Sequence, residues 1–166
     1  MRRALALSFV ATIFAAPFSV EAAGAGSAAK VAAADQVQCT IRTAVGSEKA
    51  GGVDKRLSKL RKQFSKPPFS AFKSIKLLST RSLTIGQGAS QRATLPNSKV
   101  LKLTFKERLL AQGKQRLRLH LSITKPKSRK FLPGTLYTIA DGGTLLVGGA
   151  QHQGGTLIFA ITCKAK

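Results

Sequence analysis

Cysteine, histidine, tryptophan and acidic residues are all scarce in this chain of 166 residues. Two cysteines cannot form a four-cysteine zinc site, and two histidines add few other metal-binding combinations. There are only six aspartates and glutamates, and they lie far apart in sequence. The sequence therefore gives no indication of an active site with two paired carboxylates. The chain has no tryptophan and one tyrosine, so it offers few aromatic side chains on which single-stranded nucleic acid could stack.

Motifs of known enzyme classes are missing as well. His120 falls on the polar face of an expected strand, and His152 lies in the glycine-rich stretch 148–155. That stretch lacks the Gly-Lys-Ser/Thr ending of a phosphate-binding loop and does not begin a helix. We therefore expect a chain that is not an enzyme, with no catalytic residue, no metal and no cofactor. A pocket joining either histidine to an acid would argue against this expectation.

The N-terminus carries the only long hydrophobic run. Arg2 and Arg3 precede an uncharged apolar stretch over residues 4–20, and Glu21 and small residues follow it. This order is typical of a secretory signal peptide, which we place at residues 1–22. A retained membrane anchor is the alternative, but the run is short for a bilayer span and contains Pro17. We expect export to the periplasm or outside the cell, with no transmembrane span after processing.

Basic residues greatly outnumber acidic ones. There are 28 lysines and arginines, which give a formal net charge of +22. Cleavage after Ala22 would leave 26 basic and 5 acidic residues, a net charge of +21. Residues 23–35 are rich in Ala, Gly and Ser and are expected to form a flexible leader before a single domain over 36–166. A hydrophobic content of 43% is enough for that domain to form a packed core.

The hydrophobic pattern predicts a mainly β domain. Residues 115–123 alternate strictly between apolar and polar side chains, which indicates an antiparallel strand with one buried face. Eight other segments read as short strands, namely 37–45, 69–78, 82–85, 91–95, 100–106, 136–140 paired as a hairpin with 144–147, and 156–163. Residues 107–113 fit a helical turn or a long hairpin loop. We expect an antiparallel β-sandwich or partly open barrel of about 8–9 strands.

One helix is expected, near the N-terminus of the mature domain. Asp54 is a suitable N-cap for a helix over residues 55–65, and Pro67 and Pro68 would end it. One face of this helix would carry Leu57, Leu60, Arg61 and Phe64. The opposite face would carry only basic residues, namely Lys55, Arg56, Lys59, Lys62 and Lys66. The sequence thus predicts a basic amphipathic helix that packs on the sheet.

The two cysteines lie in the first and last expected strands. Cys39 alternates in step with Val37 and Ile41, and Cys163 with Phe159 and Ile161, so both should point inward. In an oxidising compartment such a pair forms a disulfide. We predict a Cys39–Cys163 bond that joins the ends of the domain, with two buried free thiols as the alternative.

The positive charge is the remaining functional signal. A field of this size attracts polyanions, and for an exported protein these include anionic lipid, lipopolysaccharide and acidic polysaccharide, with nucleic acid bound only non-specifically. We predict non-catalytic binding of an anionic surface or polymer at the cell envelope. The expected contacts, acting as unspecific cations, are Lys59, Lys62, Arg116, Arg118, Lys127, Arg129 and Lys130.

Two other interpretations of the charge stay open. The basic face could dock an acidic protein partner, which would make the chain a structural or accessory subunit of an envelope or secretion assembly. The excess of lysine could also do no more than keep an exported domain soluble. Binding that depends on salt and on particular residues separates these interpretations.

Overall fold

The computed structural model describes residues 35–124 and 130–166, which contain nine strands in two sheets and short helices. The expected signal peptide, and the expected leader up to residue 34, lie outside the described residues. Asp35, the last residue of the expected leader, contacts the domain: its carbonyl oxygen accepts a hydrogen bond from the Gln87 N–H (2.8 Å), and its carboxylate lies 3.4 Å from Arg108.

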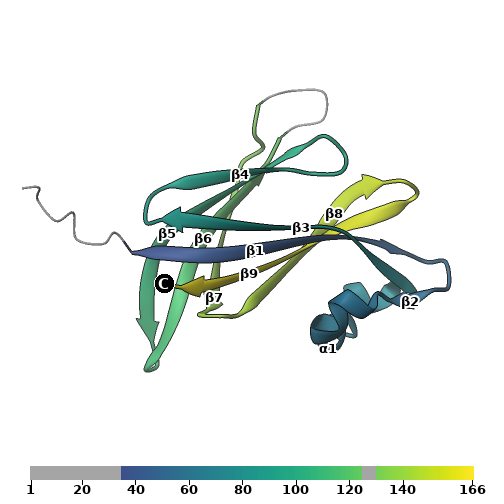
Figure 1. Cartoon of the computed structure of the whole chain (residues 1–166), viewed down its shortest axis with the longest axis horizontal. Coiled ribbons are helices and arrows are strands. Elements are labelled where there is room, and N and C mark those ends of the chain that lie inside the picture. The colour runs from purple at the N-terminus through teal and green to yellow at the C-terminus, as the bar shows by residue number, and fades with distance from the viewer. Residues whose placement is uncertain (1–34, 125–129) are drawn as a thin grey trace, which may run out of the picture. The chain divides into compact units, whose positions relative to one another are not determined.

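A five-stranded sheet contains the first and last strands side by side. Its strand order is β2 (Gly52–Val53), β3 (Ser74–Gly86), β1 (Gln36–Ser47), β9 (Gly155–Ala165) and β8 (Thr144–His152), as seen in Figure 1. β1 pairs antiparallel with both β3 and β9. The chain ends of the domain therefore meet at the centre of this sheet.

The second sheet has four antiparallel strands in sequence order. These are β4 (Ser90–Thr94), β5 (Val100–Ala111), β6 (Lys114–Ile123) and β7 (Thr135–Ala140). Alternate residues of β5 and β6, such as Leu103 and Leu119, are fully buried, as the alternating pattern of this region predicted. Between Phe105 and Glu107 the register of β5 shifts, which marks a bulge.

Inward-facing residues of both sheets form one shared core. Side chains from β1, β3 and β9 meet those from β4, β5, β6 and β7 in a single cluster that includes Ile41, Phe105, Leu117, Ile139 and Phe159. The mainly β prediction is therefore confirmed.

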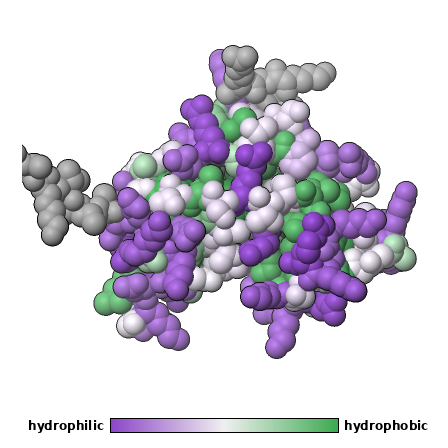
Figure 2. All heavy atoms as spheres, viewed as in Figure 1, coloured by the Kyte–Doolittle hydropathy of each residue, from purple (hydrophilic) through white to green (hydrophobic). Residues whose placement is uncertain are grey.

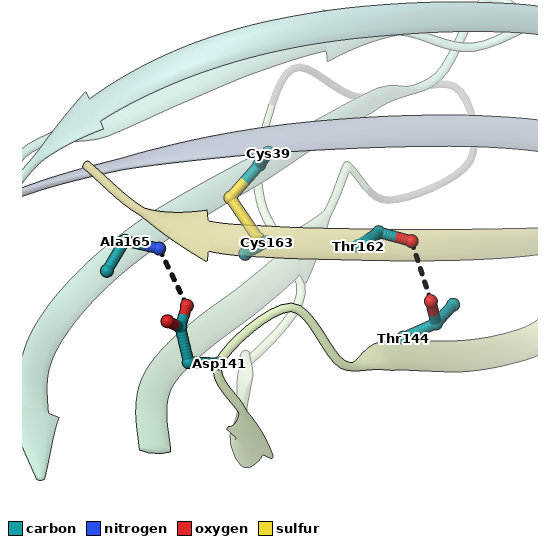
Figure 3. Close-up of a disulfide and its surroundings, with 6 residues drawn as sticks. All are labelled: Cys39, Asp141, Thr144, Thr162, Cys163 and Ala165. Carbon is teal, nitrogen blue, oxygen red and sulfur yellow. Dashed lines mark hydrogen bonds between the residues drawn. A yellow bond between two sulfur atoms is a disulfide. The ribbon is translucent and has the colours of Figure 1, made fainter. Parts of the chain in front are cut away.

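The predicted disulfide is present in that core. Cys39 of β1 and Cys163 of β9 are directly opposite each other in the strand pairing, with Cα atoms 4.0 Å apart, and both are fully buried (Figure 3). The parity argument holds because β1 and β9 both remain regular around the cysteines. The bond spans 124 positions and fixes the first strand to the last.

The expected helix over 55–65 is shorter and of a different type. A 3-10 helix, η1 (Lys55–Leu60), leads into a single α-helical turn, α1 (Arg61–Phe64). We call residues 55–64 the helical segment. Leu57, Leu60 and Phe64 are buried as predicted, whereas Arg61 is exposed rather than on the apolar face. The 3-10 geometry has three residues per turn, so the α-helical spacing assigned Arg61 to the wrong side.

The helical segment packs on the outer face of the five-stranded sheet, the face turned away from the shared core. Its buried residues join Ala44, Ile75, Ile158 and Ala160 in a second cluster. β9 is thus buried on both faces, because its alternate residues belong to the two different clusters. A second short 3-10 helix, η2 (Phe69–Ala71), follows α1.

Several local predictions were wrong. The expected hairpin of 136–140 with 144–147 does not form, because β7 pairs with β6 in one sheet and β8 with β9 in the other. Residues 69–78 and 82–85 are not separate strands; residues 74–86 make one strand, β3, after η2. Residues 107–111 continue β5, and the glycine-rich stretch 148–155 is mostly strand, with its turn at Gln153 and Gly154.

Candidate anion-binding surfaces

The structure places the predicted contact residues in separate regions. Lys59 and Lys62 are exposed on the helical segment, on the outer side of the five-stranded sheet. Arg116 and Arg118 belong to β6 and alternate with core residues, so they lie on the outer face of the four-stranded sheet. Lys130 is exposed next to Phe131, and Lys127 and Arg129 lie outside the described residues. The described residues thus form two basic regions on different sheets.

The outer face of the four-stranded sheet is one of these regions, and we call it the basic face. Four of its cations, Arg92, Lys102, Arg116 and Arg118, come from β4, β5 and β6. Arg92 and Lys102 are directly opposite in the β4–β5 pairing. Directly opposite side chains on one sheet face have Cβ atoms about 5 Å apart, and like charges at that spacing destabilise the pairing. This arrangement favours an anion that neutralises both groups.

Phe131 lies beside this pair of cations. Its ring centroid is 5.5 Å from the Arg92 guanidinium carbon and 5.8 Å from the Lys102 Nζ. An isolated bridge between Thr124 and Phe131 brings the ring to the sheet. Contacts of this kind contribute about 0.5–1 kcal/mol at exposed sites, so the ring offsets part of the repulsion and leaves both cations charged.

The chain after Phe131 runs beside β6 and leads into β7. The Leu132 N–H donates to the Ile123 carbonyl oxygen (2.8 Å), and Gly134 lies against the His120 ring. A Cβ atom at Gly134 would overlap that ring, so this position needs glycine for close approach. Gly134 therefore packs against His120, which is half-buried on the polar face of its strand.

The single described acid on the basic face is already engaged. Glu107 is opposite Arg118, and its Oε1 accepts a hydrogen bond from Arg118 Nη1 (2.6 Å). Arg116 has no ion pair within the described ranges, and its Nε is shielded from solvent without a hydrogen-bond partner. Arg116 therefore keeps an uncompensated positive charge on the basic face.

Sequence reasoning did not predict Arg92, Lys102 or Phe131 as contacts. The alternation of residues 100–106 put Lys102 on the polar side of its strand, but nothing in the sequence paired it with Arg92. The pairing of β4 with β5 and the position of Phe131 are tertiary properties, so the sequence held no signal for this cluster.

Cations also surround the start of the helical segment. The Asp54 side chain caps η1, since its Oδ1 accepts from the Arg56 backbone N–H (2.9 Å), and its carboxylate receives two further hydrogen bonds from the Arg56 guanidinium. These hydrogen bonds hold the pKa of Asp54 well below its ordinary range, and those from the Arg56 side chain contribute most. The same pairing raises the pKa of Arg56. Asp54 is thereby committed to Arg56 and leaves Lys59 and Lys62 uncompensated.

Figure 2 shows one face of the molecule, over most of which hydrophilic side chains project, with smaller hydrophobic areas between them. In the described part of the chain, no group of three or more histidines, cysteines and acids is placed to hold a metal ion. None of the helices among the described residues has the length and hydropathy needed to cross a bilayer. Comparison with protein-family models, curated proteins and solved structures gave no match.

Proposed function

We propose that this protein is an exported, non-catalytic domain that binds an anionic surface or polymer at the cell envelope through the basic face. The buried disulfide is compatible with an oxidising compartment, which supports export to the periplasm or outside the cell. We interpret the two sheets as a partly open sandwich, because they share one core while keeping separate edges.

The observation that carries the proposal is the opposition of Arg92 and Lys102 on the basic face. A charge excess that served only solubility could be met by scattered lysines. Here two cations occupy directly paired positions beside Phe131. The acid described on that face, Glu107, already forms an ion pair with Arg118. Such a cluster lowers stability in the free protein and gains from a bound anion. Anionic lipid, lipopolysaccharide and acidic polysaccharide all carry anionic groups that could bind there.

A salt titration of the oxidised, mature protein tests the proposal. Anionic vesicles, lipopolysaccharide, an acidic polysaccharide and duplex DNA are compared at about 0.15 M salt, where the Debye length is about 8 Å. We expect one of the first three to bind well under these conditions and DNA to bind only at low salt. Equal binding of all four, fading alike as salt rises, would mean a generic field and would end the proposal.

Paired variants locate the binding. We expect Arg92→Gln/Lys102→Gln to weaken binding and to reduce the salt slope by about two, since each lost phosphate contact lowers it by about one. Lys164→Gln/Lys166→Gln removes the same charge from exposed positions outside the basic face and should have a much smaller effect. Arg116 and Arg118 are less suitable for charge reversal, because an acid at position 118 would face Glu107.

A second candidate is an accessory subunit that docks an acidic protein partner. Two exposed leucines favour it: Leu132 is 42% exposed, and Leu136, opposite His120 on the basic face, is 52% exposed. Apolar side chains beside cations suit a protein interface whose core excludes water. This candidate predicts a saturable complex that survives about 0.5 M salt and is lost on Leu136→Asp, whereas polyanion binding would fade at that salt.

A further inference from the structure

We propose that a cavity beneath the helical segment binds a small sugar-like ligand that carries a phosphate or carboxylate group. The cavity lies between the helical segment and the outer face of the five-stranded sheet, and its volume is about 240 Å³. Pockets for drug-sized ligands begin at about 300 Å³, so this cavity suits a ligand of about one sugar unit. The site is on the opposite sheet from the basic face and does not depend on the function proposed above.

The sheet supplies a cationic and hydroxyl-bearing floor. Arg42 of β1, Thr144 of β8 and Thr162 of β9 line it. The Thr144 and Thr162 hydroxyl oxygens are 2.7 Å apart (Figure 3). One hydroxyl donates to the other, and the accepting hydroxyl keeps its own hydrogen, which it can donate to a ligand oxygen.

The disulfide holds this floor in place from behind. Thr162 and Cys163 are consecutive in β9 and therefore point to opposite faces of the sheet. The Cys39–Cys163 bond joins β1 to β9 within the core, one layer below the cavity. The strands that carry Arg42 and Thr162 are thus covalently linked, which keeps the floor residues preorganised for binding.

The charges lining the cavity are positive and only partly compensated. The helical segment contributes Arg56 and Lys59. Arg56 is neutralised by Asp54, at 2.8 Å between Nη2 and Oδ2. Neither Arg42 nor Lys59 makes an ion pair with an acid of the described residues. Two uncompensated positive charges therefore line the site, which matches the charge of a phosphate monoester and also accommodates a carboxylate.

The remaining wall residues favour a ligand with hydroxyl groups and an apolar face. Gln63 lines the cavity, and its Oε1 is buried without a hydrogen-bond partner. Since the terminal torsion of glutamine is broad, the amide can turn toward a ligand hydroxyl and recover the missing bond. Leu57 and Leu60 add apolar surface that suits the C–H face of a sugar ring. An anion carrying a sugar ring satisfies all of these groups, whereas inorganic phosphate satisfies only the cations.

Calorimetric titration of the oxidised full-length protein tests the proposal. The probes are glucose 6-phosphate, glucuronate, inorganic phosphate and glucose at about 0.15 M NaCl, which screens distant charges. We expect at least one of the two sugar anions to bind about tenfold more tightly than inorganic phosphate or glucose. Lys59→Gln and Arg42→Gln should each weaken that binding about tenfold, the loss expected for one charge-assisted hydrogen bond.

Lys62→Gln is the matched control. Lys62 is exposed on the same helical segment and carries the same charge, but it does not line the cavity. A specific site therefore predicts little change in this variant. Equal weakening by Lys59→Gln and Lys62→Gln, equal affinity for inorganic phosphate, or no binding below about 10 mM would each overturn the proposal. Lys59 is exposed, so Lys59→Gln should fold normally, and a thermal unfolding scan checks this.

Two further measurements identify the source of the ligand and separate the two sites. Displacement of the sugar anion by an acidic polysaccharide fragment would support binding of a polymer unit, and failure to displace would support a free sugar anion. Arg92→Gln/Lys102→Gln should leave sugar-anion binding unchanged. If that variant lost sugar-anion binding, the cavity would not be a site independent of the basic face. If it lost only polymer binding, the result would bear on the function proposed for the basic face and not on the cavity.

Discussion

Breaking the Cys39–Cys163 bond should remove a large share of the stability of this domain. The cysteines are 124 positions apart, and the chain-entropy relation for a loop of that length gives about 4.9 kcal/mol at 25 °C. Residual structure in the unfolded chain lowers such values, and measured losses are commonly about 2–4 kcal/mol. A domain of this size is stable by about 5–15 kcal/mol in total. We therefore expect the reduced protein to lose about 2–4 kcal/mol.

Urea unfolding of the oxidised protein and of protein reduced in the unfolded state measures this loss. Reduction keeps both sulfur atoms, so it isolates the missing cross-link. Cys39→Ala/Cys163→Ala also removes buried volume and should be less stable still. The reduced chain should show the larger m-value, because its unfolded state is less restricted and exposes more surface. Free energies of unfolding that agree within about 0.5 kcal/mol would refute the entropic argument.

Two other predictions concern local contacts. Gly134→Ala should destabilise the protein by about 1–3 kcal/mol, because the added Cβ overlaps the His120 ring. The control is Gly86→Ala, whose Cβ meets no atom within 4 Å and should change the urea midpoint little. Equal losses of stability in the two variants would contradict this prediction. The pKa of Asp54 is depressed by Arg56, so its carboxylate stabilises the fold above an unfolded-state pKa of about 3.9, and that stability is lost as pH falls further. Urea midpoints between pH 6 and 2 should therefore fall less steeply for Asp54→Asn than for the unmodified protein, and parallel curves would exclude the contribution.

The parts of the fold that the sequence predicted correctly share one property: their side chains alternate without interruption. Residues 115–123 are regular, and both their strand and its buried face were predicted correctly. The disulfide followed from parity in β1 and β9, where the strands are regular around Cys39 and Cys163. Buried Leu57, Leu60 and Phe64 were also predicted, because the first two are three residues apart, as one 3-10 turn requires, and the last two are four apart across the α-helical turn.

The errors arose where pairing partners, rather than local pattern, decide the structure. Residues 136–147 contain two strands and a glycine turn, as in a hairpin, but the chain passes from one sheet to the other at that turn. No local signal distinguishes the two outcomes. The bulge after Phe105 interrupts the alternation of β5, so the second half of that strand read as a loop or helical turn. The basic face and the cavity both depend on such pairings, which explains why the sequence predicted cations but not their grouping.

The grouping also bears on whether the charge serves only solubility. A purely solubilising charge would be expected on exposed, flexible side chains, where repulsion is weak and hydration is complete. Several cations here are instead half-buried: Arg42 lines a cavity, Arg116 has a shielded Nε, and Lys102 faces Arg92 across a strand pair. Each of these placements loses hydration or adds repulsion in the free protein. A bound anion reverses both effects, so these half-buried cations support anion binding more strongly than the net charge does.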